Sequence, residues 1–244
     1  MALDGMFLYQ LRQELAEKAL GARVDRIHQP AREEIIIALR WKGGAGKLLL
    51  SANAGSPRIH FTEAAPENPK QPPMLCMLMR KRLQSARLVR LEQQGLERVL
   101  CLVFDAVNEL GDHVELRLYM EVMGRYSNII FVDEKGKIID ALKRVDAEMT
   151  SERLVLPGLS YELPPPQNKL CLLEATLEEA LSRIRLMKEG TELSKAVLNS
   201  LQGVSPIVCR ELAYKTGRGV ELRLGDMGEE QWQRFRFFLG RLQE

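Results

Sequence analysis

The sequence predicts an α+β protein in which an antiparallel β-sandwich with two flanking helices precedes a domain built only of helices. Many short strand-like runs with turn signals between them lie in the first part of the chain, and only two helical stretches accompany them. A proline-rich stretch over residues 157–166 is the clearest boundary, and beyond it the hydrophobic period becomes helical. We therefore predict a β-sandwich domain over residues 1–168 and a helical domain over residues 169–244.

The first helix is expected to begin after Asp4, a good N-cap residue, and to end at Gly21. Alternating apolar residues then predict strands, and a proline-rich connector leads into a second helix at about 74–86. Further strands follow that helix. The expected strands cover residues 23–28, 33–41, 47–51, 58–62, 88–92, 98–104, 114–120, 128–132 and 137–142.

The last part of the chain carries four groups of apolar residues at helical spacing. They begin near Leu173, Thr191, Ile207 and Trp232. The turn around Gly203 and Ser205 resembles a helix-hairpin-helix unit, whose backbone N–H groups face an anion at a helix N-terminus. We expect Gly203 and Ser205 to lie at such a phosphate contact.

Basic residues outnumber acidic ones most strongly between Pro73 and Leu100, a stretch that includes the consecutive Arg80, Lys81 and Arg82 at the end of the second helix. Such a cluster fits either a solvated helix face or a surface that contacts phosphates. The overall net charge of +2 is too small to decide between them.

The stretch 121–128 joins two predicted strands through an unusually polar hinge that contains Glu121, Arg125, Tyr126 and Asn128. These side chains could bind a polar ligand, or they could satisfy the backbone of a solvated turn. The pattern alone leaves both interpretations open.

The remaining composition argues against several classes of protein. The cysteines and histidines are scattered without metal-ligand spacing, so we expect neither a metal site nor a cofactor. The N-terminus lacks the pattern of a signal peptide, and no apolar run is long enough to span a bilayer. We expect a cytoplasmic protein without a membrane partner.

Several motifs occur in order along the chain: Asp4-Gly5-Met6-Phe7, Ile27-His28-Gln29-Pro30, Leu48-Leu49-Leu50-Ser51-Ala52, Pro72 to Lys81, Gly95-Leu96-Glu97-Arg98 and Glu121 to Asn128. Together they resemble the NFACT family, the RqcH-type ribosome-associated quality-control factors related to NEMF and long described as fibronectin-binding protein A. Members continue into a coiled-coil arm and an RNA-binding domain. The resemblance therefore implies an N-terminal fragment.

The resemblance also implies that the protein binds nucleic acid and catalyses no reaction itself. Family members bind tRNA and the large ribosomal subunit that still carries peptidyl-tRNA. The bacterial members recruit alanyl-tRNA for template-free addition of alanine to the stalled chain. Two family motifs needed for tRNA recruitment fall on Glu97-Arg98 and on Glu121-Val122-Met123, with Glu97 in place of aspartate and Val122 in place of isoleucine. Arg98 is the residue that we expect to contact RNA most directly.

The implied fold resembles the N-terminal domain of formamidopyrimidine-DNA glycosylases, which offers a base-excision enzyme as the alternative. Those enzymes use an N-terminal proline amine and a neighbouring glutamate, whereas Ala2 and Leu3 follow Met1 here. The zinc finger of that family is also missing from the sequence. We therefore expect a protein that is not an enzyme and has no DNA partner, and the missing signal peptide argues against a surface adhesin.

Overall fold

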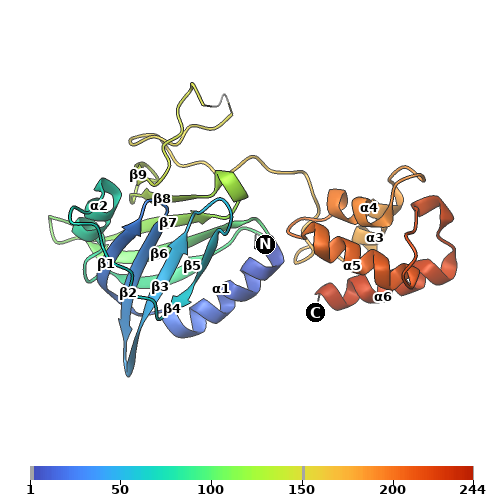
Figure 1. Cartoon of the computed structure of the whole chain (residues 1–244), viewed down its shortest axis with the longest axis horizontal. Helices are drawn as coiled ribbons and strands as arrows, with labels where there is room; N and C mark the ends of the chain where they lie inside the picture. Colours follow the sequence, from blue (N-terminus) through green and yellow to red (C-terminus); the bar gives the residue numbers. More distant parts are fainter. Residues whose placement is uncertain (1–2, 150–151, 244) are drawn as a thin grey trace. The chain divides into compact units, whose positions relative to one another are not determined.

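The strands of the described chain all lie between residues 23 and 141. The computed structural model describes residues 3–149 and 152–243, and within them the strands make one antiparallel sheet in the order β4-β3-β2-β1-β5-β6-β7-β8-β9 (Figure 1). The bounds are β1 (Arg23–Ala31), β2 (Glu34–Trp41), β3 (Gly44–Ser51), β4 (Arg58–Thr62), β5 (Arg87–Glu92), β6 (Val99–Val107), β7 (His113–Glu121), β8 (Asn128–Val132) and β9 (Ile138–Ala141).

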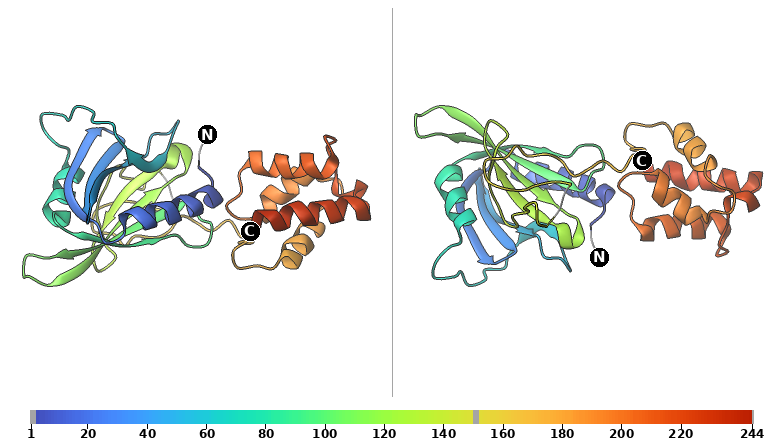
Figure 2. Two further views of the ribbon diagram at one scale, coloured as in Figure 1. Left: turned by 90° about the horizontal axis from the view of Figure 1, so that it is seen from below. Right: turned by 90° about the horizontal axis from the view of Figure 1, so that it is seen from above.

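The sheet is joined most weakly at its middle, where one residue pair, Arg23 and Arg87, connects β1 to β5. On either side of this seam, alternate residues such as Ile37 in β2 and Leu102 in β6 are fully buried in one shared core. The β1–β4 half therefore lies against the β5–β9 half (Figure 2). The predicted antiparallel sheet is confirmed, but its halves are hydrogen-bonded as one continuous sheet, whereas a sandwich consists of two.

Two helices complete this core, as the sequence predicted. Helix α1 (Gly5–Ala19) buries Leu8 and Leu15, and helix α2 (Met74–Leu83) buries Met79. The prediction placed the end of α2 at residue 86, whereas the helix ends at Leu83. Ser85 has a φ of 64°, a left-handed conformation that cannot continue a right-handed helix.

Four further helices form a second group: α3 (Leu177–Arg185), α4 (Leu193–Ser200), α5 (Pro206–Gly217) and α6 (Glu229–Gln243). Helix α3 begins later than its apolar pattern suggests because Thr176 and Glu179 cap it reciprocally. Pro206 occupies the first turn of α5, where its missing N–H costs no helical hydrogen bond. Phe235 and Leu239 of α6 are fully buried.

Backbone contacts divide the chain into two compact units. Of the described chain, the first unit holds residues 7–93, 98–149 and 152–164 together with Leu3. The second holds residues 165–243 and two short earlier segments, Asp4–Met6 and Gln94–Glu97. Gly5 allows these segments to meet, because a Cβ atom there would lie 1.8 Å from the Leu96 carbonyl oxygen and 2.8 Å from the Gly203 Cα. The helical unit is therefore assembled from three separate parts of the sequence.

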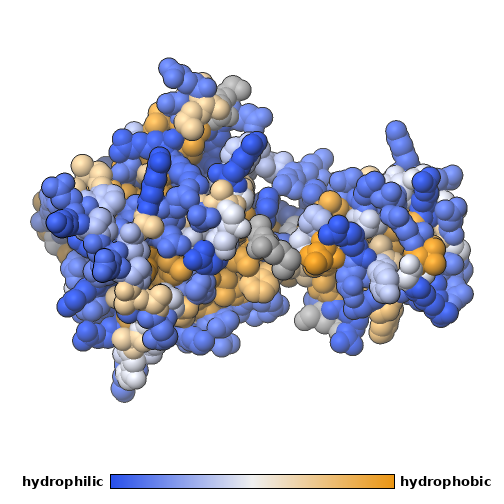
Figure 3. Space-filling view, viewed as in Figure 1, coloured by the Kyte–Doolittle hydropathy of each residue, from blue (hydrophilic) through white to orange (hydrophobic). Residues whose placement is uncertain are grey.

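The surface of both units is mixed in polarity. Hydrophilic residues cover most of the face shown in Figure 3, and hydrophobic residues are scattered between them. Across residues 3–149 and 152–243, no helix combines the length and apolar character required to cross a bilayer.

Candidate functional site

The polar hinge connects β7 to β8 through a short 3₁₀ turn, η1 (Gly124–Tyr126). Gly124 adopts a φ of 57°, a backbone conformation that residues other than glycine rarely adopt. The buried Ser127 hydroxyl accepts a hydrogen bond from the Met123 N–H at 2.8 Å. The turn is thus fixed by its own residues.

Glu121 points into the protein and not toward solvent. Its residue is 1% exposed, and Val122 beside it is fully buried. Arg153 donates two hydrogen bonds to the Glu121 carboxylate, from Nη1 to Oε2 at 3.1 Å and from Nη2 to Oε1 at 2.5 Å. The Tyr161 hydroxyl donates a third, to Oε1 at 2.9 Å. Glu121, predicted as a binding residue, is therefore already fully bound within the protein.

Aromatic rings enclose this ion pair. The Tyr161 ring stacks on Tyr119 with a centroid distance of 3.7 Å, and the Arg153 guanidinium lies 5.2 Å from the Tyr161 centroid. Burial, followed by the negative charge of Glu121, raises the pKa of Tyr161 above its ordinary value. Tyr161 therefore remains a neutral hydrogen-bond donor toward Glu121.

Asn128, at the other end of the hinge, also binds the protein itself. Its side-chain amide donates to the Lys143 carbonyl oxygen at 2.7 Å, and its Oδ1 accepts from the Lys143 N–H at 2.9 Å. Lys143 in turn forms an ion pair with Glu33 at 2.8 Å. Glu121 and Asn128 of the hinge thus bind groups of the protein itself, which favours a structural role for these two side chains.

Arg125 and Tyr126 remain at the surface of the hinge. The Arg125 guanidinium lies 4.7 Å from the centroid of the Tyr126 ring, which is 67% exposed. Met123 is half-buried between this exposed turn and the buried Val122. A cation stacked on an exposed aromatic ring is a group that can also stack on a nucleobase.

The structure brings Arg98 next to the hinge. The Val122 N–H donates to the Arg98 carbonyl oxygen at 2.8 Å. This bond lies directly next to the pair of Val99 and Glu121, which is the last pair between β6 and β7 at this end of the strands. The Arg98 side chain is half-buried and, among the described residues, has no hydrogen bond or ion pair. Its guanidinium is thus available to a ligand, in contrast to that of Arg153.

Glu97 lies in the helical unit and is bound there. Gln202 donates from Nε2 to Glu97 Oε1 at 2.6 Å and accepts from the Leu96 N–H at 3.0 Å. Gly95, with a φ of 51°, lets the loop come close to Gln202. The carboxylate of Glu97 therefore fixes the loop that carries it.

The predicted phosphate contact at Gly203 and Ser205 faces a carboxylate of the chain. Ser205 precedes α5, and its N–H donates to Asp4 Oδ2 at 3.1 Å. The Gly203 carbonyl oxygen accepts from the Met6 N–H at 3.1 Å. A carboxylate is favoured at a helix N-terminus for the same electrostatic reason as a phosphate. Asp4 thus uses one donor that the sequence had assigned to RNA.

The three basic residues at the end of α2 have different surroundings. Arg80 donates from Nε to the Ile27 carbonyl oxygen at 2.7 Å, so it is anchored on β1. Lys81 pairs with Glu109 at 2.7 Å on the surface, and Arg82 is exposed. Lys81, and to a lesser extent Arg82, lower the pKa of the Glu109 carboxyl. Lys81 and Arg82 can reach a phosphate, whereas Arg80 has a structural partner.

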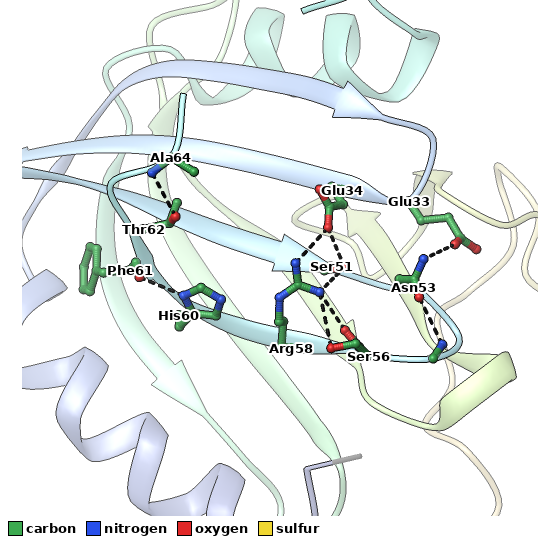
Figure 4. A network of polar contacts seen from close by, with 11 residues as sticks. Glu33, Glu34, Ser51, Asn53, Ser56, Arg58, His60, Phe61, Thr62 and Ala64 are labelled. Carbon is green, nitrogen blue, oxygen red and sulfur yellow. Dashed lines mark hydrogen bonds and ion pairs between the residues drawn. The ribbon is translucent and has the colours of Figure 1, made fainter. Parts of the chain in front are cut away.

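A second polar network crosses β2, β3 and β4 (Figure 4). Glu34, Ser51 and Arg58 are neighbours on adjacent strands. Ser51 donates to Glu34 Oε1 at 3.0 Å, and Arg58 Nη2 donates to the same oxygen at 3.1 Å. This network, like the partners of Glu121, was absent from the predicted site.

Among residues 3–149 and 152–243, histidine, cysteine and carboxylate side chains form no group of three or more that could hold a metal ion.

The chain is similar to known proteins over nearly its whole length. The model of a family described as "NFACT N-terminal and middle domains" matches residues 4–243. A Bacillus subtilis protein named "Rqc2 homolog RqcH" is 43% identical over 218 residues, which make up 89% of this chain and 38% of that protein. The human "Ribosome quality control complex subunit NEMF" is 28% identical over 204 residues, or 84% of this chain and 18% of that protein.

Solved structures show the same fold. The N-terminal part of the fibronectin/fibrinogen-binding protein of Streptococcus suis has a TM-score of 0.82 and 32% identity, covering 97% of this chain and 84% of that chain. The N-terminal domain of the fibronectin-binding protein PavA of Streptococcus pneumoniae has a TM-score of 0.79 and 32% identity, covering 86% and 77%. The chain spans 38% or less of the length of the curated relatives described above.

Proposed function

Because the chain belongs to the family of NFACT N-terminal and middle domains, we propose that it is the tRNA-binding part of a ribosome-associated quality-control factor. In this proposal it binds tRNA and the large ribosomal subunit that carries stalled peptidyl-tRNA, in the cytoplasm. It recruits alanyl-tRNA for template-free alanine tailing. The names of its relatives, which include a subunit of the ribosome quality control complex, support this role.

In this proposal, the protein itself catalyses no covalent reaction. Peptide-bond formation belongs to the ribosome, and holding the acceptor tRNA in place reduces the entropic cost of that reaction. The predicted β-sandwich domain (residues 1–168) and helix-hairpin-helix domain (residues 169–244) would share the contact with RNA.

Two features carry the proposal: the Arg98 guanidinium has no hydrogen bond or ion pair among the described residues, and the Arg98 backbone is bonded to the hinge that exposes Arg125 and Tyr126. The backbone bond from Val122 keeps Arg98 at the hinge, while no carboxylate among the described residues competes for its side chain. A guanidinium can hydrogen-bond a phosphate or a base edge through two N–H groups and can stack on a base. An exposed aromatic ring supplies a second stacking surface for unpaired RNA bases.

Binding of tRNA to this chain tests the proposal directly. We expect Arg98→Ala to weaken binding to bulk tRNA by about 1–3 kcal/mol, the range for a bidentate contact. The melting temperature should stay nearly unchanged because the Arg98 side chain has no hydrogen bond or ion pair to lose among the described residues. Fluorescence anisotropy across a salt series measures the affinity, since phosphate contacts make it salt-dependent.

Arg40→Ala is the matched control, because it removes the same charge from an exposed position on β2. An equal loss of affinity in both variants would show that Arg98 acts only through net charge. Stronger binding to a lesion-bearing DNA duplex than to tRNA would instead support the glycosylase-like alternative.

A further inference from the structure

The two ends of the hinge hold one long irregular segment, which follows β9. Asn128 binds the backbone of Lys143 near the start of this segment, and Glu121 binds Arg153 and Tyr161 toward its end. Between these points, Val145 and Val155 form an isolated antiparallel bridge. The described parts of the segment extend beyond the sheet and return to it (Figure 1). We name residues 142–149 and 152–161 the anchored segment.

We infer that Glu121 is a positioning residue, which acts through Arg153 and Tyr161 to hold the anchored segment and the RNA-binding side chain of Arg98 in place. The inference rests on the function proposed above. It assigns to Glu121, and to two residues outside any motif of the sequence analysis, a part in RNA binding that needs no contact with RNA.

The surroundings of Glu121 favour a positioning role over direct contact with a ligand. Its side chain is 2% exposed, and both carboxylate oxygens accept hydrogen bonds from the protein. A ligand could reach the carboxylate only after Arg153 had left it. That would leave a buried charge without a partner, which is strongly unfavourable.

The sheet connects Glu121 to Arg98. Glu121 is paired with Val99 across the strands, and the next residue, Val122, donates its backbone N–H to Arg98. A shift at the end of β7 therefore moves the strand end that carries Arg98. Within residues 3–149 and 152–243, the Arg98 guanidinium has no side-chain partner that would correct such a shift, so its position depends on the backbone.

The orientation of the Arg153 side chain also depends on Glu121. Its side chain is 14% exposed, and its Nε is buried without a hydrogen-bond partner in the described part of the chain, so the two bonds to Glu121 fix the orientation of the guanidinium. Although burial opposes the charged form, the hydrogen bonds and charge of Glu121 raise the pKa of Arg153 above its ordinary value. Arg153 is thus a permanent cation that requires this partner.

The inference is tested with the 244-residue chain and bulk tRNA. We expect Glu121→Gln and Arg153→Met each to weaken binding by about 2–30-fold, the range for residues that affect a site without touching its ligand. The double variant should bind no more weakly than either single variant, because both substitutions break one and the same anchor. Tyr161→Phe, which removes a single hydrogen bond, serves as a milder variant and should give a smaller loss.

Ile37→Val is the matched control, since it weakens the fully buried core at β2 without touching the anchor. It should lower stability and leave the affinity for tRNA unchanged. Hydrogen exchange should be faster in the anchored segment for Glu121→Gln and Arg153→Met, but not for Ile37→Val.

The outcomes separate the two proposals. Normal tRNA affinity in folded Arg153→Met and Tyr161→Phe would overturn the inference and leave the proposed function intact. Additive losses in the double variant would also overturn it, because they would indicate a separate contact for Glu121. Failure of the unsubstituted chain to bind tRNA would overturn the proposed function itself.

Discussion

Two polar networks in the sheet unit contain nearly the same groups and differ in burial. Each joins a glutamate, an arginine and a hydroxyl: Glu34, Arg58 and Ser51 in one, and Glu121, Arg153 and Tyr161 in the other. The side chains of Arg58 and Glu34 are 34% and 26% exposed, whereas those of Arg153 and Glu121 are 14% and 2% exposed. The chemistry is shared, so burial decides what each network does.

Water can replace a lost partner in the first network but not in the second. Ion pairs that are in contact with solvent contribute little to stability, because hydration competes with the pair. A buried pair is different, because removing one partner leaves the other charge unpaired in a medium of low dielectric constant. The first network therefore only links neighbouring strands, whereas the second determines the position of a whole segment.

Arg153→Met should produce the largest effect, because it leaves the Glu121 carboxylate buried with only the Tyr161 hydroxyl. We expect a loss of about 3–5 kcal/mol in the free energy of unfolding, the range for a broken buried pair. Urea denaturation measures it. A loss below that of Arg58→Met would show that water reaches Glu121 freely and would remove the contrast between the networks.

Tyr161→Phe should have an intermediate effect. The substitution keeps the ring that stacks on Tyr119 and removes one hydrogen bond to a charged carboxylate. We expect a loss of about 1.5–3 kcal/mol, the range for a hydrogen bond to a charged group. The same denaturation experiment applies. A loss as large as that of Arg153→Met would show that the hydroxyl, not the ion pair, dominates the anchor.

Arg58→Met should have the smallest effect. Ser51 continues to donate to Glu34 after the change, so no buried polar group loses its only partner. We expect a loss of about 0–1 kcal/mol, and it should shrink further in high salt because exposed pairs are screened. Thermal denaturation at low and high salt tests this. A loss that does not change with salt would indicate packing by the arginine stem instead of charge.

The sequence could predict the setting of the first network but not the partners in the second. Glu34, Ser51 and Arg58 lie in or beside runs predicted as strands, and cross-strand register brings them together. Arg153 and Tyr161 lie 32 and 40 residues beyond Glu121 in a segment without regular structure. No periodicity constrains such residues, so their contact with Glu121 could not be deduced.

Asp4 illustrates a similar limit in the helical unit. Its position before a helical pattern predicted an N-cap, and α1 does begin at the next residue. Its carboxylate also accepts a hydrogen bond from Ser205, which lies 201 residues further along the chain. Helix-terminus electrostatics favour an anion near Ser205, and in the structure the Asp4 carboxylate of the same chain lies there. The sequence could not show that the chain supplies this group itself.

The three-part composition of the helical unit has a consequence for how the protein is made. During synthesis, Asp4–Met6 are translated about 200 residues before their partners Gly203 and Ser205. At roughly 5–20 residues per second, this delay is on the order of 10–40 seconds. Closing so long a loop is entropically unfavourable until the partners exist. The contacts of Asp4–Met6 with this turn therefore form only after residues 203–205 have been translated.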